Sequence, residues 1–178
     1  MKRRMLALAC GLALGAASAH AELRTGTKAP DFTAEASLGG NEFTFSLAEA
    51  LKRGPVVLYF YPAAFTSGCT IEAHDFAEAQ GEFAAAGATI IGVSSDDIAT
   101  LKRFSVSECR SKFAVAADAD MHIIKSYDAK LALLSYANRT SYVIAPDGTI
   151  LYAYTDMDPE PHITNTLAAL RKWRAEQK

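Results

Sequence analysis

The sequence predicts an α/β protein with a mixed central sheet flanked by helices. Apolar runs at 56–61, 89–94 and 113–117 have the length and the β-branched or aromatic character of buried strands, and helical patterns separate them. Near the end of the chain, two further strand patterns flank Pro146-Asp147-Gly148, a turn sequence. Strands joined by helices pair in parallel and hairpin strands pair antiparallel, so both kinds of pairing are expected in one sheet.

The first part of this pattern extends to the first buried strand. The segment 22–41 is rich in Gly, Thr and Pro and is expected to run along the surface with short extended pieces. Ser46 and Glu49 fit a capping box, so a short helix should begin there and end near Gly54. The strand at 56–61 is apolar on both faces and is therefore expected to be central.

After Pro62 the spacing predicts a helix of about 18 residues that ends near Gly87. Its apolar stripe comprises Cys69, Ala73, Phe76 or Ala77, Gln80 and Phe83. A second helix should open near Asp96-Asp97, before the strand at 113–117, and a short helix should cover 121–127.

The chain closes with a hairpin and a helix. The strands are expected at 141–145 and 149–154. Asp158 and Pro159 resemble an N-cap followed by a first-turn proline. The docking face of this helix should contain Ile163, Leu167, Leu170 and Trp173. A thioredoxin-like fold is the most economical form of this element order.

The N-terminal residues have the pattern of a secretory signal peptide. A basic start at Lys2-Arg3-Arg4 precedes an apolar run at 5–17, and Ala19-His20-Ala21 fits the small-x-small cleavage pattern. The apolar run is shorter than the roughly 20 residues that span a bilayer, so no stable membrane anchor is expected. The sequence therefore predicts cleavage after Ala21, a domain at 22–178, and a periplasmic or secreted location.

The charge and the cysteines of the remaining chain narrow its function. The full chain has a formal net charge of −2, and removal of three basic residues with the signal peptide makes it −5. This balance gives no electrostatic case for nucleic-acid binding. Cys69 and Cys109 remain, in a compartment where thiols tend to oxidise.

Cys69 lies in TSGCT, at the start of the long predicted helix. It could be a buried apolar residue, half of a disulfide, a metal ligand or a nucleophile. Unpaired N–H groups and the macrodipole at a helix N-terminus favour a thiolate, and such placement can lower a cysteine pKa from about 8.5 to roughly 3.5–7.5. Thr66 occupies the first position of a Cys-x-x-Cys motif, so dithiol exchange within that motif is excluded.

The stretch from Pro62 to Cys69, PAAFTSGC, fits the Pro-x-x-x-Thr-x-x-Cys signature and resembles the peroxiredoxins. The longer YFYPAAFTSGCTIEAHDF is similar to the bacterioferritin-comigratory, or peroxiredoxin Q, subgroup, and the likeness runs from Ala29 to the last helix. The resemblance implies a thioredoxin-like fold without a cofactor. It also implies thiol-dependent reduction of hydrogen peroxide and organic hydroperoxides, with Cys69 as the peroxidatic residue.

The resemblance also assigns roles around the sulfur. Thr66 would orient the peroxide, backbone N–H groups of Gly68 and Cys69 would donate to it, and Pro62 would shield the sulfur from water. These donors are needed because charge builds on the departing oxygen during attack.

Two charged residues complete the site that the resemblance implies. Arg139 matches the distant arginine by which peroxiredoxins hold the thiolate and the peroxide. Glu72 matches an acidic residue that braces this arginine, although a carboxylate in a first helical turn is also favourable by itself.

The sequence leaves open which thiol restores Cys69 after it has been oxidised by the peroxide. Many members of the subgroup place a resolving cysteine five residues after the first, where this chain has His74. Cys109 is the remaining candidate for an intramolecular disulfide, and the alternative is a one-cysteine cycle with an external thiol. A metal site made of Cys69, His74, Cys109 and His122 is not expected, because the close paired spacing of structural zinc ligands is missing.

Two other functions compete with the peroxidase interpretation. One is a thioredoxin-like thiol-disulfide oxidoreductase, and the other is a noncatalytic binding module. For a peroxidase, the expected partners are a thioredoxin-like or other thiol reductant, and the chain is expected to be a monomer or a homodimer.

Overall fold

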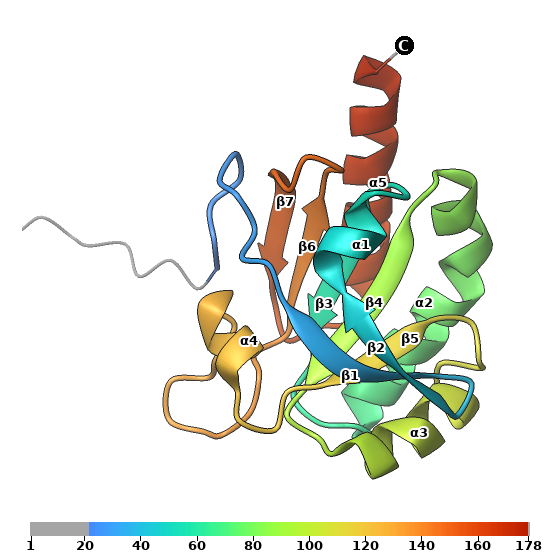
Figure 1. Cartoon of the computed structure of the whole chain (residues 1–178), viewed down its shortest axis with the longest axis vertical. Coiled ribbons are helices and arrows are strands. Elements are labelled where there is room, and N and C mark those ends of the chain that lie inside the picture. The colour runs from blue at the N-terminus through green and yellow to red at the C-terminus, as the bar shows by residue number, and fades with distance from the viewer. Residues whose placement is uncertain (1–21, 178) are drawn as a thin grey trace, which may run out of the picture.

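The computed structural model describes residues 22–177, and the predicted signal peptide, residues 1–21, lies outside this part of the chain (Figure 1). This part of the chain forms seven strands and five helices. In chain order they are β1 (Thr33–Leu38), β2 (Asn41–Ser46), α1 (Leu47–Leu51), β3 (Val56–Phe60), α2 (Ser67–Ala85), β4 (Thr89–Ser94), α3 (Ile98–Ser107), β5 (Ala114–Ala117), α4 (His122–Ser126), β6 (Thr140–Ile144), β7 (Ile150–Thr155) and α5 (Glu160–Glu176).

All seven strands form one sheet in the order β2-β1-β5-β4-β3-β6-β7. β3, β4 and β5 are parallel, whereas β6 and β7 pair antiparallel at one side and β1 and β2 at the other. The mixed sheet that the sequence predicts is therefore confirmed. The long helices α2 and α5 lie on one side of it (Figure 1).

The centre of the sheet is β3, and its side chains alternate between two apolar layers. Val56, Leu58 and Phe60 face the layer that contains α1 and α4. Val57 and Tyr59 face the layer that contains α2, α3 and α5. Both faces are covered, which explains why this strand is an uninterrupted apolar run.

The β1–β2 hairpin is more regular than the sequence predicts for this region. Each strand contributes six residues, and the register runs from Thr33 opposite Ser46 to Leu38 opposite Asn41. The turn residues Gly39 and Gly40 both have positive φ, which glycine adopts without steric cost. β1 also pairs with β5, so the segment expected at the surface completes the sheet instead.

Two helix starts differ in detail from the predicted caps. The hydroxyl of Ser46 accepts from the N–H of Glu49 at 3.3 Å, but the Glu49 carboxylate pairs with Lys52 at 2.6 Å, so only half of the capping box forms. Pro159, rather than Asp158, is the N-cap of α5, although a carboxylate oxygen of Asp158 still accepts from the N–H of Glu160 at 3.3 Å.

Within residues 22–177, no helix is long and apolar enough to cross a membrane.

Candidate active site

The site begins where β3 leads through a short loop into α2. Thr66 is the N-cap of α2 in an extended conformation, and its hydroxyl donates to the carbonyl of Ala63 at 3.0 Å instead of capping the helix. The first hydrogen bond of the helix runs from the N–H of Thr70 to the carbonyl of Thr66 at 2.9 Å. The N–H groups of Gly68 and Cys69 therefore have no acceptor within the helix and can serve as donors to a ligand.

Arg139 brings a positive charge to the Cys69 sulfur from 70 residues away in the sequence. It directly precedes β6, and the β3–β6 register places Thr140 opposite Phe60, at the end of β3 from which the chain continues to Cys69. One guanidinium nitrogen, Nη2, lies 3.7 Å from the Cys69 Sγ. Both side chains are almost completely buried, with exposed fractions of 3% for Arg139 and 2% for Cys69. The sulfur is therefore almost completely inaccessible to solvent.

Two acceptors on other elements hold the same guanidinium in place. Its Nη1 donates to the buried carboxylate of Glu72, one helical turn after Cys69. Its Nε donates to the carbonyl of Met157 at 3.1 Å, in the loop between β7 and α5. Burial raises the pKa of Glu72 to about 8, although the charge and hydrogen bond of Arg139 oppose this shift.

Gly68 leaves room for the guanidinium. A β-carbon added at this position would lie 3.0 Å from Nη2 of Arg139, closer than ordinary van der Waals contact. A larger residue would therefore displace the arginine from the sulfur. Pro62, the other signature residue of this loop, is partly buried two residues after the end of β3.

A buried histidine supports the loop that anchors Arg139, and the sequence analysis misses this part of the site. The Nδ1 of His162 accepts from the Ser141 hydroxyl at 2.8 Å, and its Nε2 donates to the carbonyl of Asp156 at 2.9 Å. Burial, as the largest cause, lowers the pKa of His162 to about 4. His162 lies near the start of α5, next to Ile163 of the predicted docking face, and this position in the sequence indicates burial. Its hydrogen-bond partners lie on other elements and are not indicated by the sequence.

The second thiol lies two residues after α3, at Cys109. It is buried, and burial together with the nearby charge of Glu108 raises the pKa of this thiol. Arg110 and Ser111 follow it with φ values of 50° and 56°, in the left-handed region. Cys69 and Cys109 are both free thiols, although they belong to the same apolar cluster.

Tyr59 belongs to the same apolar cluster as the two thiols. Burial is the largest cause that raises the pKa of its phenol, and the charges of Cys109, Tyr61, Glu72 and Cys69 raise it further. Its hydroxyl has no hydrogen-bond partner within residues 22–177. The buried phenol of Tyr59 is therefore close to both Cys69 and Cys109.

The two histidines considered in the sequence analysis lie in different places. His74, on α2, contacts Glu108 through Nε2 at 2.9 Å. His122 begins α4, on the opposite side of the sheet from α2. The structure therefore does not bring His122 together with Cys69 and Cys109.

Comparisons with known proteins agree with this architecture. The AhpC/TSA family model matches residues 25–153. Peroxiredoxin Q from the chloroplast of Oryza sativa subsp. japonica is 35% identical over 148 residues, which are 82% of this chain and 66% of the relative. The chain thus spans slightly less than two thirds of the length of that rice protein.

Solved structures are similar over more of their length. The crystal structure of peroxidoxin BcpB from Mycobacterium tuberculosis superimposes with a TM-score of 0.78 at 31% identity, covering 84% of this chain and 97% of that one. Peroxiredoxin Q from Xanthomonas campestris gives a TM-score of 0.68 at 29% identity, covering 78% of this chain and 89% of that one. The thioredoxin-like fold predicted from the sequence is confirmed by this likeness.

Proposed function

The chain belongs to the AhpC/TSA family, and on that premise we propose that it is a thiol-dependent peroxidase that reduces hydrogen peroxide and organic hydroperoxides at Cys69. The observation that supports this proposal most directly is the contact of 3.7 Å between Nη2 of Arg139 and the Cys69 sulfur. A buried guanidinium and a helix N-terminus both favour a negative charge on that sulfur. The thiolate is the nucleophile that peroxide reduction requires.

In the first step, the Cys69 thiolate attacks one oxygen of the peroxide. An S–O bond forms while the O–O bond breaks, the second oxygen leaves as hydroxide or alkoxide and takes up a proton, and Cys69 becomes a sulfenic acid. Because the Thr66 hydroxyl donates to Ala63, its lone pairs are available to accept from the peroxide O–H. The N–H groups of Gly68 and Cys69 and the Arg139 guanidinium donate to the oxygens.

The protein surroundings limit side reactions of the sulfenic acid. Cys69 is almost completely buried in the first turn of α2, which follows the loop that contains Pro62. Pro62 shields the sulfur from water in this proposal.

In the second step, the Cys109 thiol attacks the sulfenic sulfur and releases water, which leaves a disulfide between residues 69 and 109. An external thiol then reduces this disulfide to restore both cysteines. The two cysteines must approach to α-carbon separations of roughly 4.4–6.8 Å, so the first turn of α2 and the segment around Cys109 have to rearrange. In the alternative cycle, an external thiol reduces the sulfenic acid directly. The burial and the raised pKa of Cys109 are the observations that support this alternative.

The cellular setting rests on the sequence. The basic start, apolar run and cleavage pattern of residues 1–21 support export and cleavage after Ala21, with a periplasmic or secreted location. The reductant is a thioredoxin-like or other thiol, and the working form is a monomer or a homodimer.

A single-turnover experiment tests the two steps separately. Reduced protein comprising residues 22–178 is mixed with one equivalent of hydrogen peroxide, and the products are identified by mass spectrometry. The protein should lose two hydrogen atoms through a 69–109 disulfide. Cys109→Ser should keep the fast first oxidation but stop at a sulfenic acid that dimedone traps, and Cys69→Ser should abolish the fast reaction.

The contradicting outcomes are distinct. Oxidation no faster than that of free cysteine would exclude the peroxidase. Unchanged turnover of Cys109→Ser with a dithiol reductant would exclude Cys109 as the resolving residue and favour the one-cysteine cycle.

A further inference from the structure

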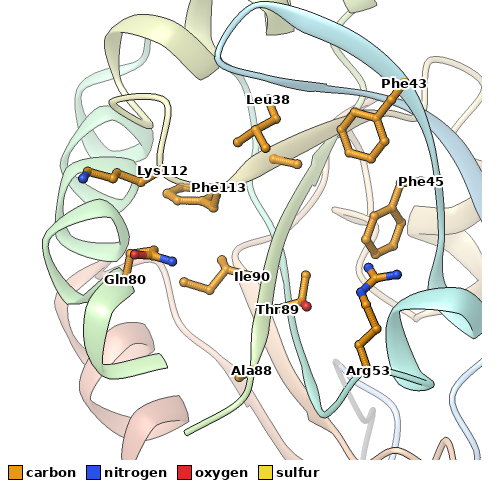
Figure 2. Close-up of a pocket in the computed structure, with 11 residues that line it drawn as sticks. Leu38, Phe43, Phe45, Arg53, Gln80, Ala88, Thr89, Ile90, Lys112 and Phe113 are labelled. Carbon is orange, nitrogen blue, oxygen red and sulfur yellow. The ribbon is translucent and has the colours of Figure 1, made fainter. Parts of the chain in front are cut away.

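A pocket lies at the edge of the sheet opposite to the one that leads to Cys69. β4 begins at Thr89 and β5 at Ala114, and both residues line the pocket (Figure 2). These strands are parallel to β3, whose far end leads to Cys69. The pocket, with a volume of about 330 Å³, is therefore separate from the proposed peroxidase site.

Large apolar side chains form most of the pocket surface. Phe45, Ile90 and Phe113 are buried, whereas Leu38 and Phe43, on the β1–β2 hairpin, remain 41% and 42% exposed. Single exposed apolar residues are common on protein surfaces, but here two of them border the same concave site. A ligand with an apolar body would remove this area from water.

The charged side chains at the pocket are all positive. Arg53 and Lys112 line it, and no Asp or Glu does so among residues 22–177. The Arg53 side chain rises from the end of α1 toward Phe45, whereas the Lys112 ammonium points outward at the rim (Figure 2). Nη1 of Arg53 donates to the backbone carbonyl of Glu49 at 3.2 Å, and neither cation has a carboxylate partner within the described residues. In a chain with a net charge of −2, such a pocket is complementary to an anion.

We propose that this pocket binds a small carboxylate with an apolar body, such as a medium-chain fatty acid. The guanidinium of Arg53 would bind the carboxylate, because its planar set of N–H groups matches two carboxylate oxygens. The alkyl chain would lie against Phe43, Ile90 and Phe113. The volume is near the lower end of the roughly 300–1,000 Å³ typical of ligand pockets, which limits the ligand to a short chain.

The pocket is also connected to the segment that carries Cys109. The backbone N–H of Lys112 donates to the carbonyl of Cys109 at 2.9 Å. The Phe113 ring packs against Tyr59 and Phe76, with ring centroids 6.0 Å and 6.2 Å apart. A ligand that packs against Phe113 holds residues 109–114 in the arrangement in which Cys109 and Phe113 are buried. The effect of this ligand on disulfide formation rests on the proposed function, whereas the binding of the ligand to the pocket does not depend on that function.

Isothermal titration calorimetry with octanoate tests the binding. Octanoate should bind one site per chain, and 1-octanol and octylamine, which share the chain length but lack the negative charge, should bind at least tenfold more weakly. Arg53→Gln and Phe43→Ser should each weaken octanoate binding about tenfold or more. Lys52→Gln is the matched control, since Lys52 is next in the chain but pairs with Glu49 outside the pocket.

Hydrogen exchange locates the ligand. Octanoate should slow exchange of the backbone amides at 109–114 in the wild type and in Cys69→Ser, so the result does not depend on peroxidase activity. Equal affinity for 1-octanol, unchanged binding to Arg53→Gln, or protection confined to another part of the chain would each overturn the proposal. Loss of peroxidase activity with intact octanoate binding would overturn only the proposed function.

Discussion

The imidazole Nε2 of His74 lies 2.9 Å from the carboxylate of Glu108, the residue that precedes Cys109. One turn further along α2, Glu78 pairs with Arg110 at 3.0 Å. The helix that carries Cys69 in its first turn thus binds both chain neighbours of Cys109. These contacts tether the segment on both sides of Cys109 and therefore oppose its movement out of the buried position.

Removal of either contact should accelerate disulfide formation. Partly exposed side-chain pairs of this kind contribute about 0.2–1 kcal/mol, so His74→Ala or Glu78→Ala should speed the conversion of sulfenic acid to disulfide by about 1.4- to 5-fold. Rapid acid quenching followed by mass spectrometry measures this rate. Glu82→Ala is the control, because it removes an ion pair of the same helix to Arg171, on α5. An equal acceleration in the control, or none in the two variants, would contradict this role of the contacts.

Gly68→Ala should slow the first oxidation by about tenfold. The added β-carbon would lie 3.0 Å from Nη2 of Arg139, and the guanidinium cannot retreat freely because Glu72 and Met157 hold it. Stopped-flow measurement of peroxide consumption checks the rate. Gly81→Ala is a matched control in the same helix, since its β-carbon meets no atom within 4 Å. Gly81→Ala should keep the rate and stabilise the protein by up to about 1 kcal/mol.

Arg139→Lys should reduce the rate of the first oxidation on the order of 100-fold, comparable to the loss of one preorganised donor at a developing charge. A lysine ammonium cannot donate to Cys69, Glu72 and the Met157 carbonyl with the planar geometry of the guanidinium. Stopped-flow kinetics measure the rate, and circular dichroism with urea shows whether the variant remains folded. A folded variant with the wild-type rate would show that Arg139 does not contribute to the first oxidation.

The protein should lose stability between pH 6.5 and pH 4 because of His162. Its pKa is about 4 in the folded protein and about 6.5 in the unfolded chain, so the unfolded state binds more protons in this range. The stabilisation is therefore present above pH 6.5 and is lost as the pH falls toward 4, by an amount of about 3 kcal/mol.

Urea unfolding at several pH values measures this loss. His162→Gln, which does not titrate, should show a correspondingly smaller decrease than the wild type over the same range, whatever its stability at pH 7. Parallel pH profiles of the two proteins would show that His162 is not the cause.

The central part of the fold could be predicted because its residues carry strong local signals. The run at 56–61 is apolar on both faces, and the turn at 146–148 has a specific sequence. The β1–β2 hairpin was harder to predict for two reasons. The edge strand β2 exposes most of its side chains, including Phe43. The other strand, β1, pairs with β5, which lies far along the chain. Edge strands lack the continuous apolar pattern that identifies buried ones.

The candidate site likewise contains residues that the sequence indicates and contacts that it does not. Cys69 and Thr66 are recognisable from their position at the start of a helix, and the family likeness points to Arg139. The contacts of His162 with Ser141 and Asp156, and of His74 with Glu108, join elements that are distant in the sequence. A polar residue on a helix is compatible with many partners, so these contacts follow only from the packing of the elements.

The left-handed backbone at Arg110 and Ser111 bears on the reduction potential of the protein. A non-glycine residue in this conformation is disfavoured by about 1–2 kcal/mol, and in the proposed cycle the rearrangement that brings Cys109 to Cys69 would release this strain. The reduced state alone would then carry the strain, so the equilibrium would shift toward the oxidised state and the reduction potential would become more negative. Ser111→Gly would remove the penalty at one position and make the disulfide easier for a partner thiol to reduce.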